Sequence, residues 1–285
     1  MCWVIIYINV MKEKLILGAI CGDMVGSPFE FSPIKSKEFE FISDKSEFTD
    51  DTVMTIVNML WLLEITETKE TDETVIKDKL IGLMHSIGVN YPNCGYGGHF
   101  YGWLVTKNRE PYYSWGNGSG MRVSPVGWMF DTLDDVMKYA KISAEVTHNH
   151  PEGIKGAQAI ASCVLLARQG KTKSEIKKFV EETFEYDLSR ELKDFQKEYR
   201  FDVSCMGSVP EAIICFLESE TYEDAIRNCV WLGGDCDTTG AMCGAIAEAF
   251  YGHLNEEMAQ NVMNKLDEPM KEIVIKFSKM IESKE

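Results

Sequence analysis

Helical periodicity runs through nearly the whole chain, and it restricts the fold more than any other feature of the sequence. Apolar residues recur three and four positions apart, a spacing that is typical of amphipathic helices. We expect helices at roughly 12–26, 50–66, 72–88, 131–145, 153–169, 173–185, 207–219, 221–231, 238–252 and 255–282. Only residues 3–9 and 38–42 resemble strands, whereas 91–128 is predicted to be irregular and 187–204 a surface excursion. The sequence therefore predicts an all-α fold.

The 285 residues show no internal repeat, low-complexity tract or Pro/Ser-rich linker. We therefore predict one compact domain over residues 1–285, in which 1–10 would be an N-terminal appendage if Met11 is the true start. The apolar run in 1–10 is too short to span a bilayer, and we expect no membrane association. The sequence does not give the oligomeric state, which we take to be monomeric.

The charge balance restricts the partners. The chain has 29 basic and 45 acidic residues, a net charge of −16. Such a surface repels phosphate backbones and anionic membranes, so nonspecific nucleic-acid binding is not expected. None of the nine cysteines forms a C-x-x-C pair, which is typical of reduced thiols and predicts a cytoplasmic protein.

Two acidic motifs of similar composition are the main candidates for chemistry. The first is Thr49-Asp50-Asp51 and the second is Asp235-Cys236-Asp237-Thr238, which begins 186 residues later (235 minus 49). Each motif alone could cap the helix that follows it. If the fold brings them together, four carboxylates would raise one another's pKa values, and divalent cations would remove that repulsion. An all-oxygen ligand set favours Mg²⁺ or Mn²⁺ over zinc, and two ions suit the number of ligands.

Glycines recur every four residues near both motifs, at Gly18, Gly22 and Gly26 and again at Gly240 and Gly244. Glycine within a helix is unfavourable, so it is kept where a neighbouring backbone or a ligand must come close. The pattern is compatible with a tight helix crossing and with a binding site.

Five blocks appear in an order that is specific as a set: GAICGDMVGSPFEF (18–31), FTDDT (48–52), GNGSGMRVSPVGW (116–128), THNHPEGIKGAQA (147–159) and GGDCDTTGAMCGAIAEAFYG (233–252). With these blocks the chain resembles the ADP-ribosylglycohydrolase family, in a bacterial or phage-type branch. The resemblance implies an all-α fold around two Mg²⁺ or Mn²⁺ ions. The implied metal ligands are Thr49, Asp50, Asp51, Asp235, Asp237 and Thr238.

The resemblance implies an enzyme that cleaves the glycosidic bond between ADP-ribose and an acceptor, in ADP-ribosyl-arginine or another ADP-ribosylated protein or small molecule. Glu30 matches the family's general acid/base, with Asp50 and Asp237 as further catalytic residues. Asp23 is expected to act through hydrogen bonds. Two alternatives stay open: a two-metal hydrolase of a related nucleotide, and a non-catalytic ADP-ribose-binding or structural protein.

The remaining blocks are expected to bind the substrate. A glycine-rich loop can cradle a diphosphate with its backbone N–H groups, and His148 matches a family position close to the substrate. Arg122 could either bind substrate or form a structural ion pair, and aromatic residues of 91–115 or Tyr222 could stack on adenine. The predicted substrate-binding residues are Asn117, Gly118, Ser119, Gly120, Met121, Arg122 and His148.

Overall fold

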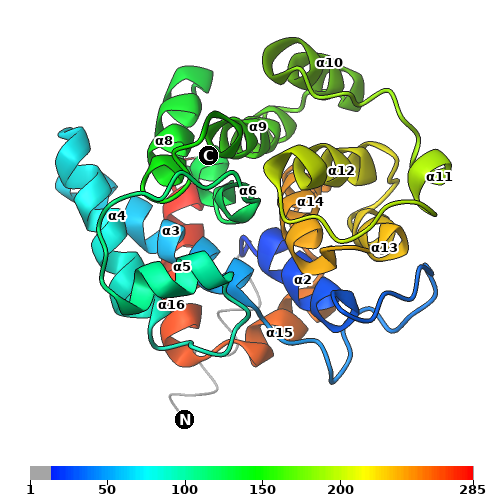
Figure 1. The fold of residues 1–285 in the computed structure, drawn as a ribbon, viewed down its shortest axis with the longest axis horizontal. Coiled ribbons are helices and arrows are strands. Elements are labelled where there is room, and N and C mark those ends of the chain that lie inside the picture. Colours follow the sequence, from blue (N-terminus) through cyan, green and yellow to red (C-terminus); the bar gives the residue numbers. More distant parts are fainter. Residues whose placement is uncertain (1–13, 285) are drawn as a thin grey trace.

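The computed structural model describes residues 14–284, and within them it contains helices and no strand (Figure 1). The all-α prediction is confirmed. The helices are α2 (Gly18–Gly26), η1 (Ser27–Phe29), α3 (Asp50–Thr68), α4 (Glu73–Gly88), α5 (Gly98–Val105), α6 (Gly118–Met121), α7 (Ser124–Met129), α8 (Leu133–Glu145), α9 (Pro151–Arg168), α10 (Lys173–Phe184), α11 (Leu192–Phe195), α12 (Cys205–Leu217), α13 (Tyr222–Leu232), α14 (Cys236–Tyr251), α15 (Glu256–Lys265) and α16 (Glu268–Glu282).

The structure differs from the sequence pattern in three places. The expected helix 255–282 is divided into α15 and α16, because Asp267 caps α16 with a 3.0 Å bond from the Met270 N–H and Pro269 occupies its first turn. Residues 38–42 form no strand, and 91–128 contains α5, α6 and α7. The predicted strand at 3–9 and the appendage at 1–10 lie outside the described residues. No helix within 14–284 is long and apolar enough to span a membrane.

The two acidic motifs both precede helices, but their first residues behave differently. Thr49 caps α3 by accepting a 3.3 Å hydrogen bond from the Asp51 N–H. Asp235 stands at the same position before α14, yet its side chain makes no capping bond there. Capping therefore accounts for Thr49 and leaves the Asp235 carboxylate available for other partners.

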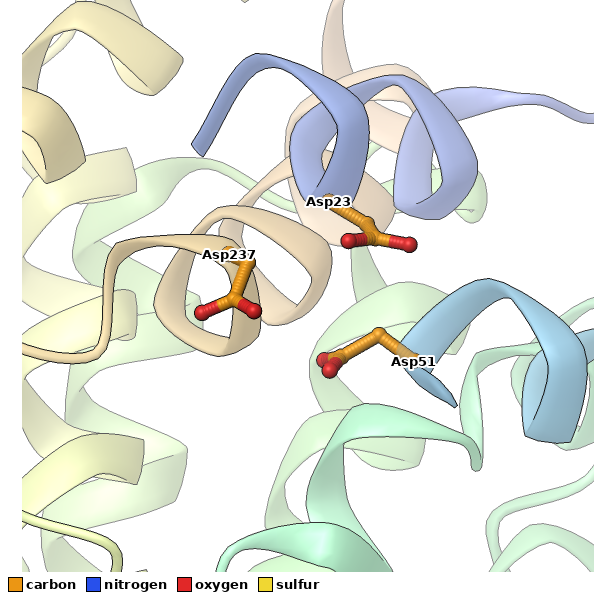
Figure 2. A group of neighbouring side chains, drawn as sticks. All are labelled: Asp23, Asp51 and Asp237. Carbon is orange, nitrogen blue, oxygen red and sulfur yellow. The ribbon is translucent and has the colours of Figure 1, made fainter. Parts of the chain in front are cut away.

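Helices α2 and α14 cross at the centre of the molecule with their backbones in direct contact (Figure 1). A Cβ atom added to Gly22 would lie 2.0 Å from the Gly240 carbonyl oxygen, and one added to Gly240 would lie 2.5 Å from the Gly22 oxygen. Only glycine permits this separation. The close crossing places Asp23 of α2 opposite Asp237 of α14 (Figure 2).

A buried carboxylate strengthens the same crossing. Glu248 of α14 is fully buried and accepts hydrogen bonds from the N–H groups of Leu17, at 3.1 Å, and Gly18, at 2.6 Å. These N–H groups have no acceptor within their own helix, and a negative charge is favourable at a helix N-terminus. Around this pair, α9, α12 and α13 pack against α14, while α4 and α16 pack against α3.

We predict that Gly22→Ala lowers the free energy of unfolding by about 2–3 kcal/mol, because its methyl group would collide with the α14 backbone. Gly82→Ala on α4 is the matched control, since nothing lies within 4 Å of its added Cβ. That substitution should stabilise the protein by up to about 1 kcal/mol. Urea unfolding of both variants measures the difference, and equal stabilities would contradict the close contact.

Candidate functional site

A cavity of about 480 Å³ lies where the N-terminal ends of α3, α6 and α14 meet. Its wall contains residues from seven separate stretches of the chain, including both acidic motifs and the glycine-rich segment. The acidic and hydroxyl groups that line it are Glu30, Asp50, Asp51, Asp235, Asp237 and Thr238. The fold therefore brings the two distant motifs to one cavity.

Two groups of three carboxylates meet beside this cavity. Asp23, Asp51 and Asp237 come from α2, α3 and α14, and one oxygen of each lies within 4.8 Å of the others (Figure 2). Glu30, Asp235 and Asp237 form a second group with the same limiting distance. Because Asp237 belongs to both groups, the two sets of oxygens adjoin each other.

Asp23 joins α2 to the start of α3 through four hydrogen bonds. Its oxygens accept from the N–H and Oγ1 of Thr49, at 2.9 and 2.8 Å, and from the N–H and Oγ1 of Thr52, at 3.1 and 2.5 Å. The expected hydrogen bonds of Asp23 are therefore present. Asp23 also stands in the first carboxylate group, a position that no local pattern indicates because only the α2–α14 crossing creates it.

Only some of the carboxylate oxygens in the cluster accept hydrogen bonds from the protein. The Thr238 hydroxyl donates to Oδ2 of Asp51 at 3.2 Å, and Nδ2 of Asn117 donates to Oδ2 of Asp235 at 2.7 Å. Oδ1 of Asp51 and Oδ1 of Asp237 are buried without a hydrogen-bond partner. Buried polar atoms normally have partners, so two carboxylate oxygens in this state indicate a place for a positively charged group.

Crowding and burial change the acidity of the cluster. Desolvation by burial raises the pKa of Asp23 to about 6, despite its four hydrogen bonds. Burial, with the nearby charges of Asp235 and Asp23, raises the pKa of Glu30 to about 7. For Asp51 and Asp237, burial and neighbouring carboxylates raise the pKa well above the ordinary value. Without a cation the cluster would therefore retain protons close to neutral pH.

Two of the predicted metal ligands are placed differently from the rest. Asp50 lines the cavity but belongs to neither carboxylate group, and its N–H donates to the Cys94 carbonyl at 2.7 Å. The Thr49 hydroxyl lies 2.8 Å from Oδ1 of Asp23 and 3.3 Å from Oδ2 of Asp51. Asp51, Asp235, Asp237, Thr238 and Glu30 are the predicted residues that the fold brings closest together.

The glycine-rich segment forms another part of the cavity wall. Asn117, Gly118, Met121, Arg122 and His148 line the cavity. In contrast, the Ser119 hydroxyl is buried and donates to the Gly153 carbonyl at 2.7 Å, while a Cβ on Gly120 would lie 3.0 Å from Sδ of Met242. These two residues pack α6 against its neighbours and are absent from the cavity wall.

Arg122 lines the cavity but is almost fully buried. One guanidinium nitrogen donates to the Ser143 carbonyl at 2.7 Å and to Oγ1 of Thr147 at 2.9 Å. Both partners are uncharged, so the bonds described for Arg122 include no structural ion pair.

An aromatic pair at the cavity was missed at the level of sequence. Phe31 follows Glu30, and its ring stacks on Phe201 with a centroid distance of 5.8 Å; both rings line the cavity, with 80% and 47% of each residue exposed. Phe201 and Val203 lie in the segment predicted to be a surface excursion, which instead supplies part of the wall. Charge and weak periodicity gave no signal of this.

Lys35 joins the two loops that carry this aromatic pair. Its Nζ donates to the carbonyl oxygens of Gln196 at 2.6 Å, Tyr199 at 3.2 Å and Leu232 at 3.1 Å. One ammonium group thus holds three separate segments beside the cavity.

Comparison with known proteins agrees with this architecture. The family model described as ADP-ribosylglycohydrolase matches residues 13–283. The protein described as ADP-ribosylhydrolase ARH3 from Mus musculus is 28% identical over 315 aligned positions, covering 82% of each chain. The protein of the same description from Bos taurus is 33% identical over 186 positions, covering 49% of this chain and 50% of the other.

A solved structure shares the fold. It is described as an ADP-ribosylglycohydrolase-related protein complex, and it superposes with a TM-score of 0.66 at 21% identity, covering 93% of this chain and 96% of the other. The family match spans nearly all of the described residues, including both carboxylate groups. This chain therefore belongs to the ADP-ribosylglycohydrolase family and is an enzyme of the glycosyl-hydrolase type.

Proposed function

We propose that the protein is a divalent-cation-dependent hydrolase that cleaves the bond between ADP-ribose and an acceptor, such as the arginine of an ADP-ribosylated protein. The observation that carries this proposal is the pair of carboxylate groups that share Asp237 beside the cavity. The relatives described as ADP-ribosylhydrolase ARH3 support the same reaction class.

The donor set fits two Mg²⁺ or Mn²⁺ ions. All candidate ligands are carboxylate or hydroxyl oxygens, which hard divalent cations prefer, and two of the buried oxygens lack any donor. Asp51, Asp235, Asp237 and Thr238 are the proposed ligands within the cluster, with Asp23 in reach; Thr49 and Asp50 are proposed ligands at its edge. When bound, such ions would neutralise the carboxylates, orient sugar hydroxyls and polarise oxygen ligands.

Glu30 is the proposed acid/base. Cleavage of a glycosidic bond needs a proton at the leaving atom and removal of a proton from the attacking water. Glu30 is half-buried on the cavity wall, and burial is the main cause that raises its pKa, to about 7 in the cation-free cluster, which favours a group that can both give and take a proton near neutral pH. Since Phe31 follows it and stacks on Phe201, we propose that the acceptor faces this aromatic pair.

The glycine-rich part of the wall is proposed to hold the rest of the substrate. A cavity of about 480 Å³ lies within the size range of pockets for small molecules. We propose that Asn117, Gly118, Met121, Arg122 and His148 bind the diphosphate and ribose, and that Ser119 and Gly120 shape α6 from behind. The full set of carboxylates favours this enzyme over a non-catalytic ADP-ribose-binding protein.

Asp237→Asn should greatly weaken cation binding and reduce turnover, since Asp237 belongs to both carboxylate groups. We expect turnover to fall on the order of 10³-fold, measured as ADP-ribose released from ADP-ribosyl-arginine, together with Mn²⁺ titration by calorimetry. Asp134→Asn, an exposed aspartate in the first turn of α8, is the control and should change neither. Full turnover by Asp237→Asn would rule out the proposed cation site.

Glu30→Gln should retain ADP-ribose binding while its kcat falls about 10²- to 10⁴-fold, because the amide cannot transfer the proton. The dissociation constant for ADP-ribose and the single-turnover rate separate binding from chemistry. Glu38→Gln replaces an exposed glutamate of the same loop and should behave like the wild type. An unchanged rate for Glu30→Gln would assign proton transfer to another group.

The stability of the cation-free protein should fall as pH rises. The folded-state pKa values of Asp23 and Glu30, about 6 and about 7, lie above their ordinary values of 3.8 and 4.5. Their protons therefore stabilise the folded state fully below about pH 4, and this contribution is lost as pH rises through about 6 to 7.

Thermal melts in chelator between about pH 5 and about pH 8 test this expectation. Adding Mn²⁺ should raise the Tm more at the higher pH, where the carboxylates are charged and repel one another. A Tm in chelator that increases over the same interval would contradict the crowded cluster.

A further inference from the structure

A chain of buried hydrogen bonds runs from Arg122 through Thr147 to His148. The Arg122 guanidinium donates to Oγ1 of Thr147 at 2.9 Å, and Oγ1 lies 2.7 Å from Nδ1 of His148. All three residues are buried: Arg122 is 1% exposed, Thr147 0% and His148 5%. No step of the reaction proposed above uses Thr147.

The direction of each bond follows from the donors. A guanidinium can only donate, so Oγ1 of Thr147 accepts from Arg122. The Thr147 hydroxyl has one proton left, and Nδ1 of His148 is its described partner. If Nδ1 carried a proton instead, Oγ1 would accept twice and its own buried proton would have no described acceptor. The arrangement therefore favours Nδ1 as acceptor and the ring proton on Nε2.

The imidazole is neutral in this setting, so its tautomer decides what it can do. Desolvation by burial and the nearby Arg122 charge lower the pKa of His148 well below the ordinary value. Arg122 itself remains charged near neutral pH, since burial lowers its pKa only to about 10.

Nε2 faces the glycine-rich wall. A Cβ atom added to Gly118 would lie 3.2 Å from Nε2, and one added to Gly116 would lie 3.5 Å from it. His148 and both glycines line the cavity. A proton on Nε2 could therefore be donated to a ligand that is bound against Gly116 and Gly118.

We propose that Thr147, held by Arg122, is a positioning residue that fixes the His148 proton on Nε2, from which it donates to an anionic oxygen of the ligand. The inference rests on the proposed function only in taking ADP-ribose, through its diphosphate, as that ligand. The tautomer itself can be measured in the free protein.

Nitrogen-15 NMR of the full chain, labelled at histidine, reads the tautomer directly. His148→Gln identifies the His148 signals among those of the five histidines. We expect a protonated Nε2 and an unprotonated Nδ1 in the free wild type, and a shift of the Nε2 signal when ADP-ribose is added. A proton on Nδ1, or an Nε2 signal that ADP-ribose leaves unmoved despite binding, would overturn the inference.

Variants at Thr147 separate positioning from packing. Thr147→Val keeps the shape but removes the hydroxyl, so the tautomer should become mixed and ADP-ribose should bind about 10- to 100-fold more weakly. KM should rise more than kcat falls, Mn²⁺ affinity should stay unchanged, and Thr147→Ser should restore the wild-type signals and affinity. Wild-type affinity in Thr147→Val would overturn the proposal.

A control variant and the spectra of folded proteins keep the possible outcomes distinct. Thr66→Val is the matched control, since the Thr66 hydroxyl contacts a methionine sulfur at 3.8 Å, outside the cavity. If Thr147→Val does not fold, the wild-type and Thr147→Ser spectra still decide the tautomer. If the wild type releases no ADP-ribose from any acceptor, the proposed function fails while the tautomer result stands.

Discussion

The backbone contact between α2 and α14 is the constraint on which the site depends. Carboxylates repel one another, and side chains on a looser pair of helices could turn away from the cluster. The Gly22–Gly240 contact leaves no room for a side chain between the two helices, and Glu248 holds the start of α2 against α14. Asp23 and Asp237 therefore face each other because main-chain atoms hold them there.

The repulsion among these carboxylates must be offset by protons or cations. Asp23 accepts hydrogen bonds from Thr49 and Thr52, but one oxygen of Asp51 and one of Asp237 accept no hydrogen bond from the protein. A site that leaves buried oxygens without donors is less stable in isolation and binds a hard cation more strongly for the same reason. Poor stability of the empty cluster and affinity for the ion thus have one physical origin.

Local patterns predicted most of the long helices, and the family resemblance implied that the two acidic motifs meet. They could not show that Asp23 joins the carboxylates, since that position exists only once α2 crosses α14. The short helices α5, α6 and α7 escaped detection because glycine-rich segments of four to eight residues carry little periodicity. Ser119 and Gly120 belong to the expected loop, yet the short α6 helix turns them toward the core.

The three hydrogen bonds from Lys35 to carbonyl oxygens show that the two sides of the cavity are built differently. Phe31 and Phe201 reach the cavity on loops that this ammonium group holds together, whereas the carboxylates stand on or beside packed helices. Loops tolerate insertions and exchanges that helix crossings do not. A change of sequence in 196–204 would therefore alter the aromatic side of the cavity while leaving the helix crossing and the carboxylates in place.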